Sequence, residues 1–362
     1  MTTLCSLSTE DPHVAVTGDD SAALLAALDP RGDGARWRAE IERCGVRRRS
    51  AVAHPARLAR LGGAGERHAL YGELAPPLAE RVARAALGRA GVDPARVGAL
   101  LVASSTGHLL PTLDYHLSAR LGLRPTARHL ALNGLGCVGG LRAAGLAADL
   151  LRDDADVALV VAIELASLWL PNGEPSPDDV RTALAFGDGA AALVLDPSGA
   201  AGGPELLASQ SILWPGSLDA RGARHTDGGL RHFASPRLPR AVLGEARRTL
   251  ADFLAGQRLT LGDLAFVAVN PSELELATAL AAHLDLPAAT VELATGTWQE
   301  HGNTLAVGPL HLLRRLARQH APRAGDLGLL LAVGPGLTCD LALLRWADLP
   351  TDHQRGNRPG LH

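Results

Sequence analysis

Uninterrupted apolar runs are the clearest pattern in this chain, and each is about as long as a β-strand. The most pronounced are Val97–Ala103, Val157–Ile163, Leu264–Val269 and Leu327–Val333, and within Ala185–Leu195 a Gly-Asp-Gly turn leads into a further apolar run. A strand that is apolar on both faces is typical of a sheet covered by helices on both sides. We therefore expect α/β layers with a largely parallel sheet.

Segments with the helical spacing of apolar residues lie between these runs. They include Pro76–Ala90, Leu238–Gly256 and Asn303–His320. After the Gly-rich stretch Pro197–Pro204, the order of strands and helices begins again. A chain of 362 residues exceeds one ordinary core, so we expect two similar halves, residues 1–200 and residues 201–362.

Composition narrows the class of protein. Apolar residues make up 47% and charged residues 20%, which is typical of a globular chain. A net charge of −3 offers no electrostatic footprint for nucleic acid.

The chain has no lysine, which excludes a Schiff-base lysine and a Walker A motif. The four cysteines lack metal-ligand spacing, so we expect neither a metal site nor disulfides. Without an export segment or a membrane-spanning run, we expect a cytoplasmic enzyme.

The stretch from Leu130 to Leu151 carries the first candidate for chemistry. An apolar strand enters a glycine-rich turn, and Cys137 lies between Gly136 and the pair Gly139-Gly140 at the expected start of a helix. Unpaired N–H groups and the helix dipole favour an anion there. Such a position lowers the pKa of a thiol and makes it a nucleophile. The same residues also fit a small cysteine buried in a helix-packing turn.

A basic run, Arg47, Arg48 and Arg49, follows a turn at Gly45. Three adjacent arginines usually form a solvated loop, whereas near the mouth of an active site they bind phosphates. The residues alone leave both interpretations open.

Six motifs in register along the chain resemble those of the thiolase-like condensing enzymes, and among these the type III polyketide synthases. They are Ser105-Thr106-Gly107 with Leu110-Pro111, Leu121–Pro125, Gly136–Gly140, Phe186–Ala191 (FGDGAA), Gly302-Asn303 and Gly334–Thr338 (GPGLT). Each motif is short, and their shared order carries the resemblance. It aligns Cys137 with the nucleophile of that family.

The resemblance implies a five-layer α-β-α-β-α fold of two similar halves, with Cys137 in the first and Asn270 and Asn303 in the second. It also implies a homodimer that loads an acyl group from acyl-CoA onto Cys137 and condenses it with a malonyl-derived unit. Malonyl-CoA or a carrier-protein-bound acyl group would be a further substrate. CoA thioesters are then substrates and no separate cofactor is expected. Arg47, Arg48 and Arg49 become candidates for binding the CoA phosphates.

One position departs from the family pattern. The family places a histidine after an apolar strand of the second half, and Asn270 stands there in this chain. An asparagine donates through its amide but carries no charge and moves no proton. We therefore expect Cys137 to depend on the helix end for its ionisation, with Asn270 and Asn303 holding an acyl oxygen. His232 aligns near the family cavity and is a candidate base, although a loop histidine without a role is the alternative.

Three functions stay open at this point. The first is a divergent type III polyketide synthase that still condenses acyl units. The second is an acyltransferase, or thioesterase-like enzyme, that passes the acyl group to an alcohol, amine or water, which the missing histidine favours. The third is a non-catalytic partner subunit, against which the presence of Cys137 and Asn303 argues.

Overall fold

The structure is a computed structural model that describes residues 2–28, 34–151, 156–169, 176–199, 202–227, 229–320 and 322–351. Its first half comprises β1 (Thr2–Glu10), β2 (Val14–Thr17), α1 (Gly18–Leu28), α2 (Gly34–Cys44), β3 (Arg48–Ala51), α3 (Pro55–Leu58), α4 (Ala64–Ala90), η1 (Pro94–Arg96), β4 (Val97–Ser104), α5 (Leu113–Leu121), β5 (Arg128–Asn133), η2 (Gly136–Val138), α6 (Gly139–Leu150), β6 (Val157–Leu165), η3 (Ala166–Trp169), α7 (Pro177–Ala185) and β7 (Asp188–Asp196).

The second half continues with β8 (Glu205–Leu213), β9 (Arg221–Thr226), β10 (Gly229–Ala234), α8 (Leu238–Gly256), η4 (Leu261–Asp263), β11 (Phe266–Val269), α9 (Leu274–His283), α10 (Ala288–His301), η5 (Leu305–Val307), α11 (Gly308–Gln319), β12 (Leu327–Gly334), η6 (Pro335–Leu337) and β13 (Thr338–Arg345). The apolar runs that predicted strands therefore became β4, β6, β7, β11 and β12.

The main strands form one continuous ladder in the order β11-β12-β13-β8-β1-β7-β6-β4-β5. Strand β4 runs parallel to β5 and β6, and β11 runs parallel to β12, whereas the other neighbours are antiparallel. The prediction of a largely parallel sheet is therefore wrong, because β1, β7, β8 and β13 alternate in direction at the centre.

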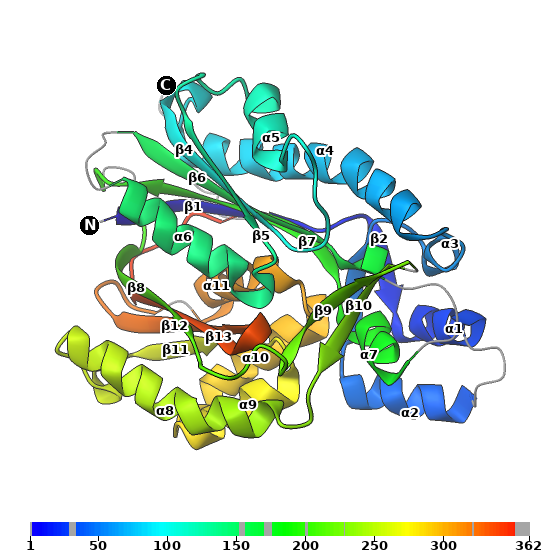
Figure 1. Cartoon of the computed structure of the whole chain (residues 1–362). Helices are drawn as coiled ribbons and strands as arrows, with labels where there is room; N and C mark the ends of the chain where they lie inside the picture. The colour runs from blue at the N-terminus through cyan, green and yellow to red at the C-terminus, as the bar shows by residue number, and fades with distance from the viewer. Residues whose placement is uncertain are drawn as a thin grey trace.

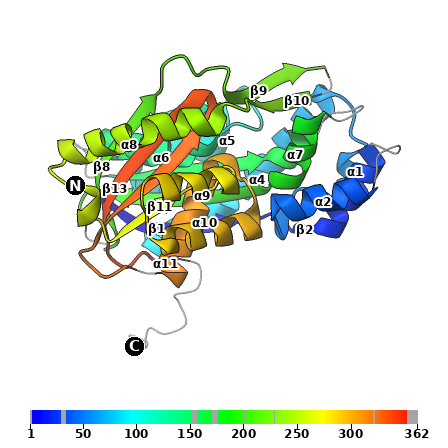
Figure 2. The same cartoon turned by 90° about the horizontal axis from the view of Figure 1, so that it is seen from below.

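The ladder is divided between two sheets with helices on both sides and between them (Figures 1 and 2). Helix α4 packs on the outer face of the first sheet, and α8 and α9 pack on the outer face of the second. Helices α6 and α11 lie between the sheets in a shared apolar core. The expected five-layer α-β-α-β-α fold is confirmed.

The two halves repeat one arrangement of strands. The order β1-β7-β6-β4 in the first sheet corresponds to β8-β13-β12-β11 in the second, and α6 corresponds to α11. The predicted boundary at residue 200 stays a prediction, because Ala200 and Ala201 lie outside the described residues.

The central helices approach each other closely where each begins with a short 3-10 turn. A Cβ placed on Gly140 would lie 2.2 Å from the carbonyl oxygen of Ala306, and one on Gly139 would lie 2.9 Å from the Ala306 Cβ. Only glycine permits such backbone approach. The Gly-Gly pair therefore lets η2, which carries Cys137, contact η5, which follows Asn303.

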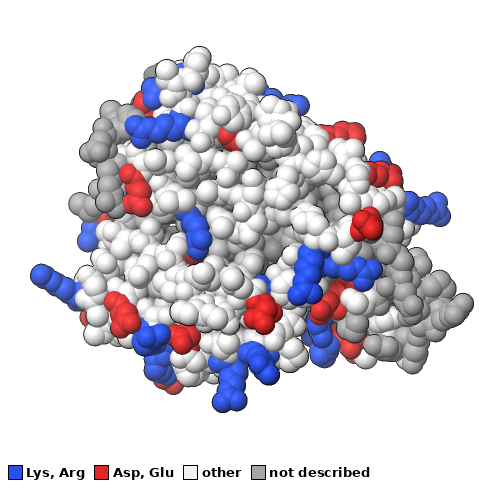
Figure 3. Space-filling model, viewed as in Figure 1, with Lys and Arg blue, Asp and Glu red and all other residues white. Residues whose placement is uncertain are grey.

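The surface shows no concentration of one charge on the face drawn in Figure 3, where acidic and basic residues are interspersed around a largely uncharged centre. Among the described helices, none has the length and apolar character needed to cross a membrane.

Candidate active site

Cys137 lies at the floor of a cavity of about 490 Å³ between the two halves. Its side chain is only 2% exposed and packs in a small apolar group with Trp169, Phe186 and Leu305. Gly136, with φ of 53°, turns the chain into η2, and a Cβ there would lie 2.7 Å from Pro335. The glycine turn thus places Cys137 in the lining of this cavity, with its thiol buried.

Asn303 is the polar partner of this thiol. The Cys137 Sγ donates to Asn303 Oδ1 at 3.4 Å, and the same oxygen accepts from the Leu305 N–H at 2.9 Å. The Asn303 Nδ2 donates to the carbonyl oxygen of Ser272 at 2.9 Å. Both ends of the amide are therefore held, and the structure brings together the two residues aligned with the family's nucleophile and asparagine.

The FGDGAA motif explains why Asn303 is so well placed. The backbone N–H of Asn303 donates to the Ala185 carbonyl at 2.7 Å, and the Gly187 N–H donates to the Asn303 carbonyl at 3.1 Å. The buried carboxylate of Asp188 accepts from the backbone N–H groups of Val52 and Ser167, each at 2.7 Å. The motif therefore clamps the backbone of Asn303 and takes no part in lining the cavity beside Cys137.

The surroundings of the Cys137 thiol oppose the ionisation that was expected for it. Burial raises the pKa of the thiol, and the guanidinium of Arg221 opposes that rise. The thiol lies inside a short 3-10 turn, ahead of helix α6 and away from solvent. Desolvation of the charged form therefore opposes the ionisation expected from the helix end, and that expectation stays a prediction.

Asn270 is in the predicted register, directly after β11, but its side chain does not point as expected. Its amide lies against Gly308, where an added Cβ would be 2.7 Å from Asn270 Oδ1. No hydrogen bond joins it to Cys137 among the described residues, and it does not line the cavity. The expected Asn270/Asn303 pair of donors beside Cys137 stays a prediction.

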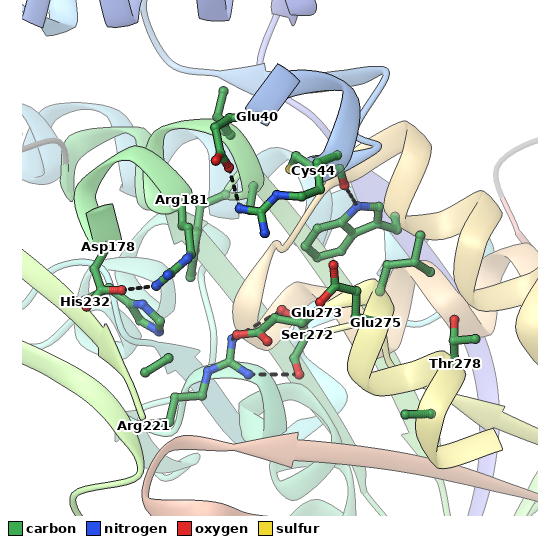
Figure 4. A pocket seen from close by; sticks show the side chains of 18 of the residues that line it. Glu40, Cys44, Asp178, Arg181, Arg221, His232, Ser272, Glu273, Glu275 and Thr278 are labelled. Carbon is green, nitrogen blue, oxygen red and sulfur yellow. Dashed lines mark hydrogen bonds and ion pairs between the residues drawn. The ribbon is translucent and has the colours of Figure 1, made fainter. Parts of the chain in front are cut away.

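A second cavity, of about 650 Å³, adjoins the first (Figure 4). His232 of β10 lines both cavities, with its ring 5.2 Å from that of Phe186. Burial, with the nearby charges of Arg221 and Arg181, lowers the pKa of His232 to about 3. His232 is therefore a neutral imidazole between the two cavities, and its role as a base stays a prediction.

The predicted phosphate-binding arginines do not form one group. The guanidinium of Arg49 is buried and donates to Ser21 Oγ at 2.7 Å and to the Ala183 carbonyl. The prediction is wrong for Arg49, since its N–H groups are engaged inside the protein. Arg47 and Arg48 are exposed beside and within β3 and do not line the larger cavity. Their contact with CoA stays a prediction.

Two buried charged residues of the site had no sequence signal. Arg221, at the start of β9, lines both cavities. Glu164, at the end of β6, accepts from the Ser105 N–H at 2.9 Å and from Thr106 Oγ1 at 2.8 Å. Ser105 in turn accepts from the Gly136 N–H at 2.8 Å. Glu164 thus links the Ser-Thr-Gly loop to the cysteine turn. The sequence shows only a polar residue at the end of an apolar run, which does not predict this role.

One cluster has the residue types of a metal site, namely Asp11, His301 and His311. The two imidazole rings are stacked, with centroids 3.9 Å apart and planes inclined by 15°. Lone pairs in parallel ring planes do not converge on one ion at bond lengths of about 2.0–2.1 Å. The Asp11 carboxylate oxygens instead lie 3.3 Å from His301 Nδ1 and 3.4 Å from His311 Nε2. Burial lowers the pKa of His311 to about 3, so that ring is a neutral imidazole.

Comparisons with known proteins agree with this geometry. Residues 60–199 match the family model of the chalcone and stilbene synthases, N-terminal domain, and residues 254–346 match that of the 3-oxoacyl-[acyl-carrier-protein] synthase III C-terminal region. The 1,3,6,8-tetrahydroxynaphthalene synthase of Streptomyces peucetius is 31% identical over 352 residues, covering 95% of this chain and 93% of that protein. The phloroglucinol synthase of Pseudomonas fluorescens is 30% identical over 293 residues, covering 77% and 80%. The crystal structure of 1,3,6,8-tetrahydroxynaphthalene synthase from Streptomyces coelicolor, a bacterial type III polyketide synthase, superposes with a TM-score of 0.89 at 26% identity and covers 95% of this chain and 99% of that one.

Proposed function

This chain belongs to the type III polyketide synthase family, and we propose that it loads an acyl group from acyl-CoA onto Cys137 and condenses it with a malonyl-derived unit. The single observation that carries the proposal is the buried Cys137 thiol in the lining of a cavity of about 490 Å³, 3.4 Å from Asn303 Oδ1. A second cavity adjoins this one at His232 and offers a path for the pantetheine arm.

The loading step requires the thiolate of Cys137. Its sulfur attacks the thioester carbonyl, an Sγ–C bond forms, and the bond to the CoA sulfur breaks, after which the released thiolate takes a proton from water. A water-excluding cavity strengthens each electrostatic contact to the carbonyl oxygen that becomes negative. In this proposal the second N–H of the Asn303 amide donates to that oxygen.

The condensation step draws on the same residues. A malonyl thioester loses CO₂, and the resulting enolate carbon attacks the acyl group on Cys137, which forms a C–C bond and releases the cysteine thiolate. The family's histidine is absent, and the amide of Asn270 lies against Gly308. We therefore propose that decarboxylation is slow compared with acylation.

Intact-protein mass spectrometry tests the loading step directly. Incubation with acyl-CoAs of increasing chain length should give one acyl adduct, and digestion should place it on the peptide that contains Cys137. Cys137→Ala should remove the adduct while leaving the fold unchanged by circular dichroism. An adduct of equal yield in Cys137→Ala, or none with any acyl-CoA, would reject the proposal.

A second candidate function has its own supporting observation. Because Asn270 carries no movable proton and its amide lies against Gly308, the acyl-cysteine could pass to an alcohol, amine or water without condensation. Release of labelled CO₂ from carboxyl-labelled malonyl-CoA separates the two functions. Acylation of Cys137 without CO₂ release would favour acyl transfer.

A further inference from the structure

Arg221 occupies the junction of the two cavities. It lines both of them and is only 4% exposed. Its Nη1 donates to Ser272 Oγ at 3.1 Å, and its Nη2 donates to the Ser272 carbonyl at 3.2 Å. Figure 4 shows the guanidinium extending towards Ser272 and Glu273, and Nη2 lies 3.5 Å from Glu273 Oε1. The segment that replaces the family's histidine motif thus holds the guanidinium in place.

The same segment connects Arg221 to the nucleophile. The carbonyl oxygen of Ser272, which accepts from Arg221, also accepts from Asn303 Nδ2 at 2.9 Å. Asn303 Oδ1 in turn accepts from the Cys137 thiol at 3.4 Å. One chain of hydrogen bonds therefore runs from the guanidinium to the thiol, and both ends line the cavity of about 490 Å³.

Two acidic residues act against this cation. Glu273 is partly exposed and paired with Arg221, whereas Glu164 is fully buried behind the cysteine turn. Burial raises the pKa of Glu164 to about 8, so its negative charge develops only near and above that pH. Both raise the pKa of the Cys137 thiol, in addition to the larger effect of burial, whereas Arg221 lowers it. An arginine stays charged at any working pH, so its charge at the junction is fixed.

The histidines that line the same cavity do not replace this charge. Burial lowers the pKa of His232 to about 3, so its imidazole is neutral. Burial also lowers the pKa of His108, which lies across the cavity beside His225. Asn270 carries no charge at all.

We propose that Arg221 is a further functional residue, which supplies beside Cys137 a positive charge that Asn270, at the position of the family's histidine, cannot supply. Glu273 opposes it and sets how much of that charge acts on the thiolate. The inference deepens the proposed function and rests on it only in taking Cys137 as the nucleophile. It gives the segment Asn270–Glu273 a role in positioning the arginine, through Ser272 and Glu273.

The test is the pH dependence of Cys137 alkylation by iodoacetamide, read from the Cys137 peptide by mass spectrometry. In Arg221→Gln the midpoint of the profile should rise by about one pH unit, and in Glu273→Gln it should fall by a smaller amount. Arg221→Lys should stay close to the wild type. Arg181→Gln, which removes one cation from the larger cavity but not from the cavity of Cys137, is the matched control and should leave the profile unchanged.

If the midpoints of the alkylation profiles shift in opposite directions in Arg221→Gln and Glu273→Gln, the effect is one of charge. Loss of packing would shift both midpoints in the same direction. If Arg221→Gln fails to fold, the Glu273→Gln profile decides alone. A midpoint in Glu273→Gln equal to or above that of the wild type overturns the inference. Alkylation needs no acyl-CoA, so this result is independent of whether the proposed function holds.

Discussion

Replacing Gly140 by alanine tests whether close approach of the two halves assembles the site. The added Cβ would lie 2.2 Å from the Ala306 carbonyl oxygen, where ordinary contact begins at 3.4 Å. Since the obstacle is backbone, η5 must move away from η2 by roughly 1 Å. Overpacking of this kind costs about 1–3 kcal/mol. A displacement of about 1 Å in a catalytic group lowers a rate by about 10²-fold.

Two assays measure these effects separately. Thermal unfolding should show a lower midpoint for Gly140→Ala, and the rate of acyl-adduct formation on Cys137 should fall by about 10²-fold because Asn303 moves with η5. Gly88→Ala is the matched control, since Gly88 lies within helix α4 and an added Cβ meets nothing within 4 Å. It should stabilise the protein by about 0.4–1 kcal/mol and leave acylation unchanged.

The reasoning is refuted if Gly140→Ala and Gly88→Ala behave alike. It is also refuted if Gly140→Ala loses stability but acylates at the wild-type rate, because the approach of η2 and η5 would then serve packing alone.

Three further predictions concern the remaining features of the site. Asn270→His should raise CO₂ release from malonyl-CoA and lower the midpoint of Cys137 alkylation, because an imidazole adds a charge and a movable proton; two unchanged values would contradict this. His232 stays unprotonated in the folded state down to about pH 3, whereas the unfolded chain binds the proton below about pH 6.5. Acidification from pH 8 to pH 5 should therefore cost the wild type about 2 kcal/mol more than His232→Phe, measured by denaturant unfolding; equal losses would count against a buried neutral imidazole. The chain should be a homodimer by light scattering at micromolar concentration, and Leu110→Asp should weaken it because that side chain is 97% exposed in the Leu110-Pro111 loop; a wild-type monomer would reject this.

The apolar pattern predicted the strands that are covered on both faces, but it missed β1. That strand reads TTLCSLSTE, in which serine and threonine outnumber the apolar residues. Its residues from Thr2 to Ser8 are nevertheless buried, and Ser6 Oγ donates to the Ala86 carbonyl of α4 at 2.8 Å. Internal hydrogen bonds allow such a strand into the core, and a sequence pattern does not reveal them.

In the site too, local sequence predicted some positions and not others. The short motifs around Cys137 and Asn303 determine the local backbone conformation, so the positions of these two residues could be predicted. The direction of the Asn270 side chain depends on Gly308, and the position of Arg221 depends on Ser272 and Glu273, which are distant in sequence. Contacts between separate segments decide these placements, and no local pattern records them.

The most direct test of the account follows the Cys137 peptide by mass spectrometry after adding an acyl-CoA and carbon-labelled malonyl-CoA together. The account predicts an acyl group that is loaded on Cys137 first and then, more slowly, a CoA thioester in the same mixture that is one labelled ketide unit longer than the starter, with neither species in Cys137→Ala. A loaded acyl group that never gains a ketide unit, while the acyl group passes to water or another acceptor, would contradict condensation by this enzyme.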